Sequence, residues 1–293
     1  MLFRSWEGHV DVDVVKTRDL TWNIGLNLSH TSSKMTDLPE AVNEYYNAYT
    51  WNYGNVRNGT TVGQPITTYS ALALERNDKG EVLINPTTGL PIVGSDWKVI
   101  GDREPKLRFG ITTALRYKNW RLSAMFQGRY HASVYNATMR EMMARGFSLQ
   151  SVDLRQDDAT YVFNGVLKDG WENTDTPHYN TIGVNFAHYG GTALYNADHE
   201  SWVQNGINYI RCQELRLTYF VPEAWLKNVT RNIIQNASVY VSGNDLFTIT
   251  NYTGIDVAGN TMSAAAGGVG GEGYDYWSLP SPRTFSFGLS VTF

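Results

Sequence analysis

The last ten residues of the chain alternate between apolar and small polar side chains, and this pattern constrains the fold more than any other feature. The apolar positions are Phe285, Phe287, Leu289, Val291 and Phe293. Successive side chains of a strand point to opposite faces of a sheet, so a period of two predicts a β-strand. One face of this strand is wholly apolar, and the other is polar.

The same period marks further strands along the whole chain. Their apolar faces are carried by Val10, Val12 and Val14; by Trp22, Ile24, Leu26 and Leu28; by Phe109, Ile111, Leu115 and Tyr117; by Trp120, Leu122, Ala124 and Phe126; by Leu215, Leu217 and Tyr219; and by Val239 and Val241. We count about seven long strands, each near the roughly 9 to 11 residues that a tilted strand needs to cross a bilayer. The sequence therefore predicts an all-β fold, an antiparallel meander that forms a portion of a transmembrane β-barrel.

Composition excludes several other classes of protein. No run approaches the roughly 20 apolar residues of a membrane-spanning helix. The net charge of −4, with no Lys/Arg cluster, gives nucleic acid no basic surface to bind. Cys212 is the single cysteine and has no CxxC or His neighbour, so we expect neither a disulfide nor a zinc site. The first residues hold no apolar core of signal-peptide length, which indicates an intracellular protein or a start that lies further upstream.

The connections between the strands are of two kinds. Residues 16–19 and 118–119 make tight turns. The long links, rich in Gly, Pro, Asn and Asp, lie at about 31–106, 131–206 and 251–281. Outer-membrane barrels show this asymmetry, with short periplasmic turns and long extracellular loops. If the last strand ends in the periplasm, both tight turns and the link at 222–235 fall on the periplasmic side.

Both faces of the predicted strands suit a membrane barrel. The polar face carries scattered charges, as a water-filled lumen does, at Arg116, Arg121, Glu214 and Arg216. Four aromatic residues lie near the predicted turns, as expected for an aromatic belt at the membrane interface. They are Trp22, Tyr117, Trp120 and Tyr219. A soluble all-β glycan-binding module, built as a sandwich, is the alternative. The two differ in the face from Phe285 to Phe293, which a barrel exposes to lipid and a sandwich buries.

Several segments resemble the SusC/RagA-like TonB-dependent transporters. Residues 209–222 (YIRCQELRLTYFVP) resemble the family's YLRLKNLTLGYTLP, and residues 239–248 (VYVSGNDLFT) resemble its VYVSGQNLFT. Residues 254–256 (GID) stand where the family has GYDPE. Residues 100–128 are similar to IGNPNPKFTYGFNLNLSYKGFDLSAFFQG, and residues 20–23 to DFEWN. These segments follow the family's order over essentially the whole chain, so the motifs taken together are specific for the family.

The resemblance implies a barrel of about 22 strands with a plugged lumen. Residues 1–293 would form the C-terminal part of this barrel, without the plug domain and the first strands. It further implies a place in the bacterial outer membrane, in contact with lipid and lipopolysaccharide, and uptake of an oligosaccharide or peptide. A SusD-like surface lipoprotein would be the partner, and the TonB complex would act through the N-terminal part. The family's Asp-rich turn reads NPTTGLP at 85–91, without its carboxylates, so we expect no calcium site.

Two further expectations follow from the strand pattern. Arg211 shares parity with Leu215 and is predicted to point outward, unless a bulge turns it inward; an outward Arg211 would meet lipopolysaccharide phosphate. The terminal strand resembles the signal that barrel-assembly machinery reads, and we assign this role to Phe285, Phe287 and Phe293. Two open edges, at the first and last strands, predict aggregation of the isolated chain unless these strands pair with each other.

We expect no enzyme, no cofactor and no metal site. Residues 268–273 (GVGGEG) satisfy GxGxxG, but neither a leading strand nor a following helix accompanies them, so a flexible loop is the better interpretation. The pairs 199–200 (His-Glu) and 157–158 (Asp-Asp) lack the spaced partners that catalysis or metal binding requires.

Two loop segments are dense in aromatic side chains. The first contains Tyr45, Tyr46, Tyr49, Trp51 and Tyr53, and the second contains Tyr274, Tyr276 and Trp277. Aromatic rings offer flat faces to a sugar or to the apolar patch of a partner, so these residues are candidate contacts for substrate or partner. The alternative is that the rings pack the loops onto one another.

Overall fold

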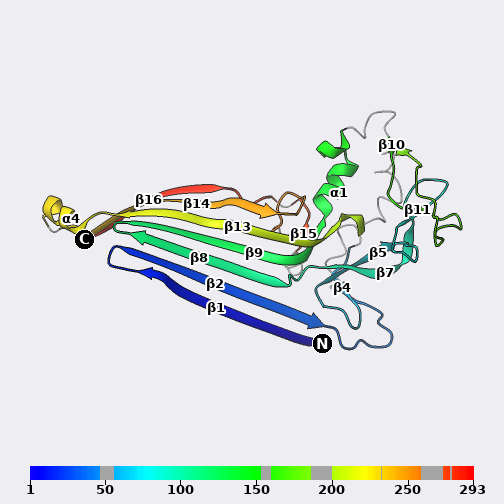
Figure 1. Cartoon of the computed structure of the whole chain (residues 1–293), viewed down its shortest axis with the longest axis horizontal. Helices are drawn as coiled ribbons and strands as arrows, with labels where there is room; N and C mark the ends of the chain where they lie inside the picture. The colour runs from blue at the N-terminus through cyan, green and yellow to red at the C-terminus, as the bar shows by residue number, and fades with distance from the viewer. Residues whose placement is uncertain (47–55, 153–159, 186–199, 232, 259–272, 278) are drawn as a thin grey trace.

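The chain folds around one long antiparallel sheet. The computed structural model describes residues 1–293 except 47–55, 153–159, 186–199, 232, 259–272 and 278. Seven long strands follow one another in space in the order of the sequence (Figure 1). They are β1 (Leu2–Lys16), β2 (Leu20–Lys34), β8 (Leu107–Tyr117), β9 (Trp120–Asn136), β13 (Val203–Phe220), β14 (Asn236–Thr250) and β16 (Thr284–Thr292). The short β15 (Tyr274–Asp275) adds a parallel pairing to β9. The predicted meander is confirmed.

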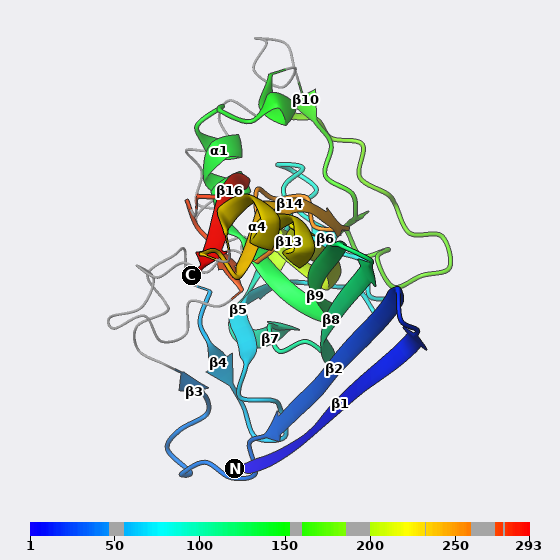
Figure 2. The same ribbon diagram turned by 90° about the vertical axis from the view of Figure 1, so that its left-hand side faces the viewer.

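The sheet is curved and open, with β1 at one edge and β16 at the other. Figure 2, seen from the end that carries α4 (Glu223–Thr230), shows the strands as a single twisted wall running from β16 to β1. This is the geometry of one portion of a barrel wall. No helix in the described part of the chain is long and apolar enough to cross a membrane.

Short and long connections lie at opposite ends of the sheet, as predicted (Figure 1). The two tight turns and α4 lie at one end, which we call the turn end. There the Lys118 amide donates to the Asp19 carbonyl at 2.7 Å, and the Phe220 amide donates to the Asn119 carbonyl at 2.8 Å. Lys118 adopts φ +52°, which closes the two-residue turn between β8 and β9.

The opposite end, which we call the loop end, carries the short strands and the other helices. Between β2 and β8 lie β3 (Tyr45–Tyr46), β4 (Gly59–Thr60), β5 (Thr68–Leu74), β6 (Leu83–Ile84) and β7 (Val93–Asp102). Between β9 and β13 lie α1 (Ala137–Ala144), η1 (Leu149–Ser151), β10 (Thr160–Tyr161), β11 (Val166–Leu167), β12 (Val184–Asn185) and η3 (Glu200–Trp202).

The strands are longer than the sequence pattern predicts. β9 has 17 residues and β13 has 18, whereas about 11 suffice to cross a bilayer. The excess lies at the loop end, where β9 and β13 contribute Tyr135 and Val203 to the packing of the loops. The alternating pattern is lost there because both faces of these strands contact protein.

One face of the sheet is a continuous apolar surface. Residues directly opposite one another on six successive strands form a single row across it: Trp22, Leu115, Leu122, Leu217, Val241 and Phe287. All are exposed, from 36% for Trp22 to 79% for Phe287. A soluble sandwich would bury such a row, whereas a barrel exposes it to lipid. The barrel prediction is therefore confirmed over the sandwich.

Aromatic side chains collect next to the turns on this apolar face. Tyr117, Trp120 and Tyr219 lie in one register row, and the rings of Trp120 and Tyr219 are 4.7 Å apart. Trp22 lies in the neighbouring row. Amphipathic rings at this depth are typical of the boundary between lipid and water.

The buried core lies among the loops rather than under the sheet. Tyr69 of β5, Tyr135 of β9 and Tyr274 of β15 are fully buried together. The Tyr274 ring meets the Tyr69 ring edge-on at 5.0 Å and the Tyr135 ring at 5.9 Å. We call these three residues the tyrosine core. It joins segments from the first and third long loops to the end of β9, so the loops form a packed layer above the sheet.

Candidate functional site

The polar face of the sheet brings together the charged residues predicted to line a lumen. Arg116 stands directly opposite Arg121, and Arg216 stands opposite Ser123 and Ser242. Glu214 is opposite Met125 and Asn244. All four residues lie in register rows that alternate with the apolar rows, so they share the polar face. Their role in a lumen stays a prediction.

Arg211 points to this polar face and not outward. A bulge between Cys212 and Glu214 shifts the register of β13 against both neighbours, so Arg211 pairs with Gln127 and Thr248. The outward orientation predicted from the parity with Leu215 is therefore wrong, and the alternative of a bulge that turns Arg211 inward is confirmed. The sequence pattern alone shows no break at this point because Cys212 suits the apolar face and Gln213 suits either face.

The side chain of Arg211 is buried in a network of polar groups. Its guanidinium forms an ion pair with Asp256 and donates to Thr248 Oγ1 at 3.0 Å and to Ser281 Oγ at 3.3 Å. Asp256 also accepts from the Ser281 amide at 3.2 Å. Asp256 belongs to the Gly-Ile-Asp segment at 254–256. This segment was matched to the family by resemblance, and no role was predicted for it. The role of Asp256 here is to fasten the segment that follows β14 onto the wall of the sheet.

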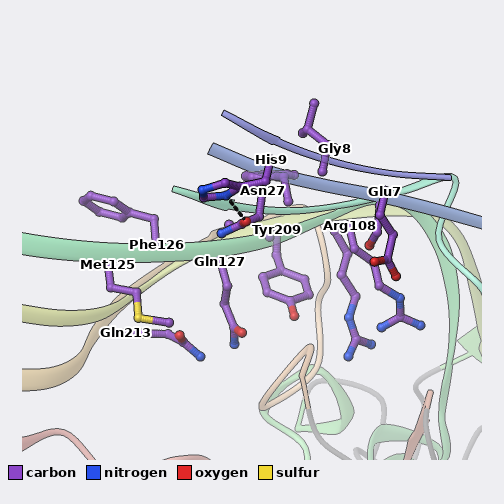
Figure 3. A pocket seen from close by; sticks show the side chains of 16 residues that line it. Glu7, Gly8, His9, Asn27, Arg108, Met125, Phe126, Gln127, Tyr209 and Gln213 are labelled. Atoms are coloured by element: carbon purple, nitrogen blue, oxygen red, sulfur yellow. Dashed lines mark hydrogen bonds between the residues drawn. The ribbon is translucent and has the colours of Figure 1, made fainter. Parts of the chain in front are cut away.

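A groove of about 580 Å³ runs along the polar face nearer the loop end (Figure 3). Its lining includes Glu7, His9, Arg108, Gln127 and Tyr209 from β1, β8, β9 and β13. Gln127, Tyr209 and Arg108 point to the same side of the sheet in Figure 3, whereas Phe126 points to the other. Aromatic, amide and charged groups on one wall can bind a polar solute that also has apolar surface.

Hydrogen bonds and ring contacts hold the groove residues in place. His9 Nδ1 lies 2.6 Å from Asn27 Oδ1. Arg108 donates to both carboxylate oxygens of Glu104 at 3.2 Å. The guanidinium of Arg129 lies 5.9 Å from the centre of the Tyr209 ring. The sequence pattern did not identify Tyr209 as a polar-face residue, because the bulge in β13 had to be known first.

The aromatic loop residues divide into buried and exposed ones. Tyr45 is exposed on β3, and Trp277 is 47% exposed after β15. Tyr276 is half-buried against the tyrosine core. Tyr274 is fully buried and its hydroxyl donates to Asn58 Oδ1 at 3.2 Å, so it packs the loops and is not available to a substrate in this structure. Tyr46 belongs to β3, and Tyr49, Trp51 and Tyr53 lie outside the described residues.

Asp275 is a buried carboxylate among the loops that the sequence did not indicate. It accepts from the Tyr252 hydroxyl at 2.7 Å and from Thr138 Oγ1 at 2.7 Å. Burial raises the pKa of Tyr252, and the neighbouring Asp275 carboxylate adds to this effect. Tyr252 therefore remains a neutral donor at all physiological pH values. This network links the loop after β14 with α1.

Of the residues considered for acid-base catalysis, the structure describes Glu200. Glu200 accepts from the Leu74 amide at 2.7 Å and from Arg76 at 2.6 Å, and so has a structural role. His199, the pair at 157–158 and residues 268–272 lie outside the described residues. Within the described part of the chain, no group of three or more His, Cys, Asp or Glu residues is arranged to hold a metal ion.

The aromatic residues of the last strand lie on the exposed apolar face. Phe285, Phe287 and Phe293 are 77%, 79% and 76% exposed. β16 pairs with β14 on one side and forms the edge of the sheet on the other. An unpaired edge with exposed rings has the form that a templating factor could bind, and the role as an assembly signal stays a prediction.

Comparison with known proteins gives consistent results for sequence and structure. No protein-family model matches the chain. TonB-dependent receptors P3 and P26 of Formosa agariphila are 24% and 27% identical to it, over 99% of this chain in each case. The chain spans 28% and 29% of the length of these two relatives.

Solved structures of similar fold are those of the RagAB peptide transporter. One matches with a TM-score of 0.59 and 17% identity, over 99% of this chain and 29% of its own. Its open-open state gives a TM-score of 0.60 at 17% identity, over 99% of this chain and 28% of its own. The predicted resemblance, β-barrel fold and outer-membrane location are confirmed by these relatives.

Proposed function

We propose that this chain, which resembles TonB-dependent receptors of the bacterial outer membrane over nearly its whole length, forms the C-terminal part of a nutrient-uptake barrel. The relatives are named as receptors and transporters, which supports a role without enzymatic activity. The observation that carries the proposal is the exposed apolar row from Trp22 to Phe287, backed by a polar face with a groove. Such a wall separates lipid from an aqueous lumen.

In this proposal the loop end faces the outside of the cell and the turn end faces the periplasm. The packed loop layer would meet the substrate, an oligosaccharide or a peptide, together with a SusD-like surface lipoprotein. Tyr45 and Trp277 are exposed and are the predicted contact residues that the described part of the chain leaves available. Lipid and lipopolysaccharide would surround the apolar face. Energy would come from the TonB complex through other parts of the transporter.

Cysteine labelling in intact cells tests the orientation. In a Cys212→Ser background, Asp175→Cys places a thiol on an exposed position of the second long loop, and Arg18→Cys places one in the first tight turn. A membrane-impermeant maleimide should label Asp175→Cys in intact cells and Arg18→Cys only after the outer membrane is permeabilised. Labelling of both, or of the turn alone, contradicts the proposal. Growth of a gene-deletion strain on single glycans or peptides then identifies the nutrient.

A further inference from the structure

Three arginines at the turn end of the polar face form no ion pair within the described part of the chain. Arg116 and Arg121 are directly opposite each other on β8 and β9, next to the tight turn. Arg216 lies diagonally from Arg121, since it is paired with Ser123 two residues along β9. Like charges at directly opposed positions destabilise a sheet. Three such residues at neighbouring positions therefore need a compensating interaction.

Several other arginines of the chain have a carboxylate partner. Within the described residues, ion pairs to a carboxylate are made by Arg57, Arg76, Arg108, Arg140, Arg145 and Arg211. Over the same part of the chain, Arg116, Arg121 and Arg216 form no ion pair. The nearby carboxylates of β1 are engaged elsewhere, because Asp13 pairs with Lys16 at 3.1 Å and Asp11 accepts from Asn23 at 2.5 Å.

Aromatic rings hold two of these guanidinium groups in position without neutralising them. The Arg216 guanidinium lies 3.7 Å from the centre of the Tyr240 ring, and that of Arg116 lies 5.6 Å from the centre of the Phe220 ring. Stacking on a ring leaves the N–H groups at the rim of the guanidinium free to donate. Arg116 Nε also donates to the Lys118 carbonyl at 3.3 Å. The positive charges are thus fixed on the sheet, and the remaining N–H groups are available to a ligand.

A second groove adjoins these residues. It has a volume of about 270 Å³ and is lined by Arg121 together with Asn23, Thr112, Ser123 and Glu214. Hydroxyl groups beside a guanidinium are suitable donors for an anionic group. Glu214 lies one register row further from the turn than Arg216, so its charge confines an anion to the arginine side of the groove.

We propose that Arg116, Arg121 and Arg216 form a binding site for an anionic group, a carboxylate, sulfate or phosphate, carried by the solute that passes along this wall. The proposal rests on the proposed function in one respect, namely that the polar face lines the transport path. It assigns to this chain a preference for acidic substrates, exerted at the periplasmic end of the path. The three guanidinium groups would receive the anion after it leaves the groove near the loop end.

Binding of a fluorescent trisulfonate, pyranine, to the full chain refolded in neutral detergent micelles tests the site. Circular dichroism and heat-modifiable migration confirm folding of each variant. Fluorescence anisotropy should show saturable binding that weakens with salt. Arg121→Gln and Arg216→Gln should each weaken binding about tenfold, since each removes a charge-assisted donor pair. Arg121→Lys keeps the charge and should lose less. Arg18→Gln, an equal charge change in the adjacent turn, should have no effect.

The outcomes separate the possible ligands. Displacement of pyranine by inorganic sulfate, phosphate or acetate identifies the preferred anion. Displacement by a tetraglutamate peptide at a tenfold lower concentration than acetate would indicate that the carboxylates of a peptide solute are the preferred anion, which supports the proposal. An equal loss in Arg18→Gln and Arg121→Gln, or no binding by the wild type, overturns it. Because this assay involves no membrane, reversed cysteine labelling would refute the transporter orientation and leave the anion site standing.

Discussion

The guanidinium of Arg211 on β13 forms an ion pair with the carboxylate of Asp256, 45 residues later in the sequence, and both side chains are more than nine-tenths buried. This contact crosses β14, because Asp256 lies in the segment after that strand. It fastens one connection at the loop end to the wall that carries the polar groove.

Replacing Asp256 by Asn should loosen this connection. Breaking a buried ion pair from one side costs about 3 to 5 kcal/mol when the remaining charge has no other partner. The cost here should lie below this range, because Asp245 Oδ1 remains 4.0 Å from Arg211 Nη1. Amide hydrogen exchange of residues 251–258 should rise strongly in Asp256→Asn. The matched control is Glu223→Gln, which breaks the exposed pair of Glu223 and Lys227 on α4 and should change little. Equal exchange in wild type and Asp256→Asn would show that the ion pair does not hold the segment.

The two faces of β13 should respond differently to substitution. Leu217→Arg puts a charge into the apolar row and should cost roughly 2 to 4 kcal/mol if the position lies near the bilayer midplane. Arg216→Leu, on the neighbouring polar-face position, should leave insertion intact and alter transport in a complete transporter. Urea titration of refolding into lipid vesicles measures the first effect. Equal insertion defects in the two variants would refute the assignment of the faces.

The glycine at position 128 should be intolerant of any side chain. A Cβ on Gly128 would come within 2.4 Å of the Tyr209 carbonyl and 2.2 Å of the Phe109 ring. Phe109 lies directly opposite Gly128 and covers it. Gly128→Ala should therefore destabilise the folded chain by about 1 to 3 kcal/mol. Gly8→Ala is the control, because a Cβ there meets no atom within 4 Å. The same loss of stability in both variants would mean that the loss comes from the strand propensity of the new residue and not from the close contacts of Gly128.

The tyrosine core should keep the loops in an ordered structure. Tyr274→Ala removes a fully buried ring and should cost about 3 to 5 kcal/mol. Tyr274→Phe keeps the ring and loses the hydrogen bond to Asn58, which should cost about 1 kcal/mol. Limited proteolysis should cut the loops of Tyr274→Ala first and leave the strands intact. Resistance equal to that of the wild type would contradict a role of Tyr274 in packing the loops.

The exposed ring of Phe293 should matter for assembly. In a complete transporter, deletion of Phe293, or addition of several charged residues after it, should lower the folded fraction in the outer membrane. Phe293→Tyr keeps an aromatic ring and should assemble normally. Heat-modifiable migration measures the folded fraction. Unchanged amounts and rates for the deletion and the extension would remove Phe293 from the assembly signal.

The strand pattern could be predicted from the sequence because each long strand keeps one apolar face and one polar face along most of its length. Trp22, Leu115 and Leu217 alternate with polar residues, and the structure places all three in one row. The turn-end helix α4 was not predicted. Its eight residues form too short a period to detect, although Pro222 at its N-cap and Glu223 in its first turn are typical of a helix start.

The polar contacts of the loops could not be predicted from the sequence. The bulge at Cys212 depends on how β13 pairs with two neighbours, which no local pattern specifies. Counting alternate positions therefore assigns Arg211 to the wrong face. The pairing of Arg211 with Asp256 cannot be predicted unless the bulge is known. Tyr274 looks like an exposed aromatic residue in sequence because its neighbours are polar. Only the contact with Tyr69, about 200 residues earlier, shows that it is buried.

The tyrosine core joins residues that lie far apart in the sequence, and this separation affects the order in which the chain folds. The Tyr69 hydroxyl donates to the Gly273 carbonyl at 2.6 Å, across a sequence separation of 204 residues. Pairing of strands such as β8 and β9 needs only a two-residue turn, so its entropic cost of closure is small. The loop layer has a far higher contact order and can close only after the third long connection has formed. The loop layer is thus completed last, and until then its apolar residues are accessible to chaperones and proteases.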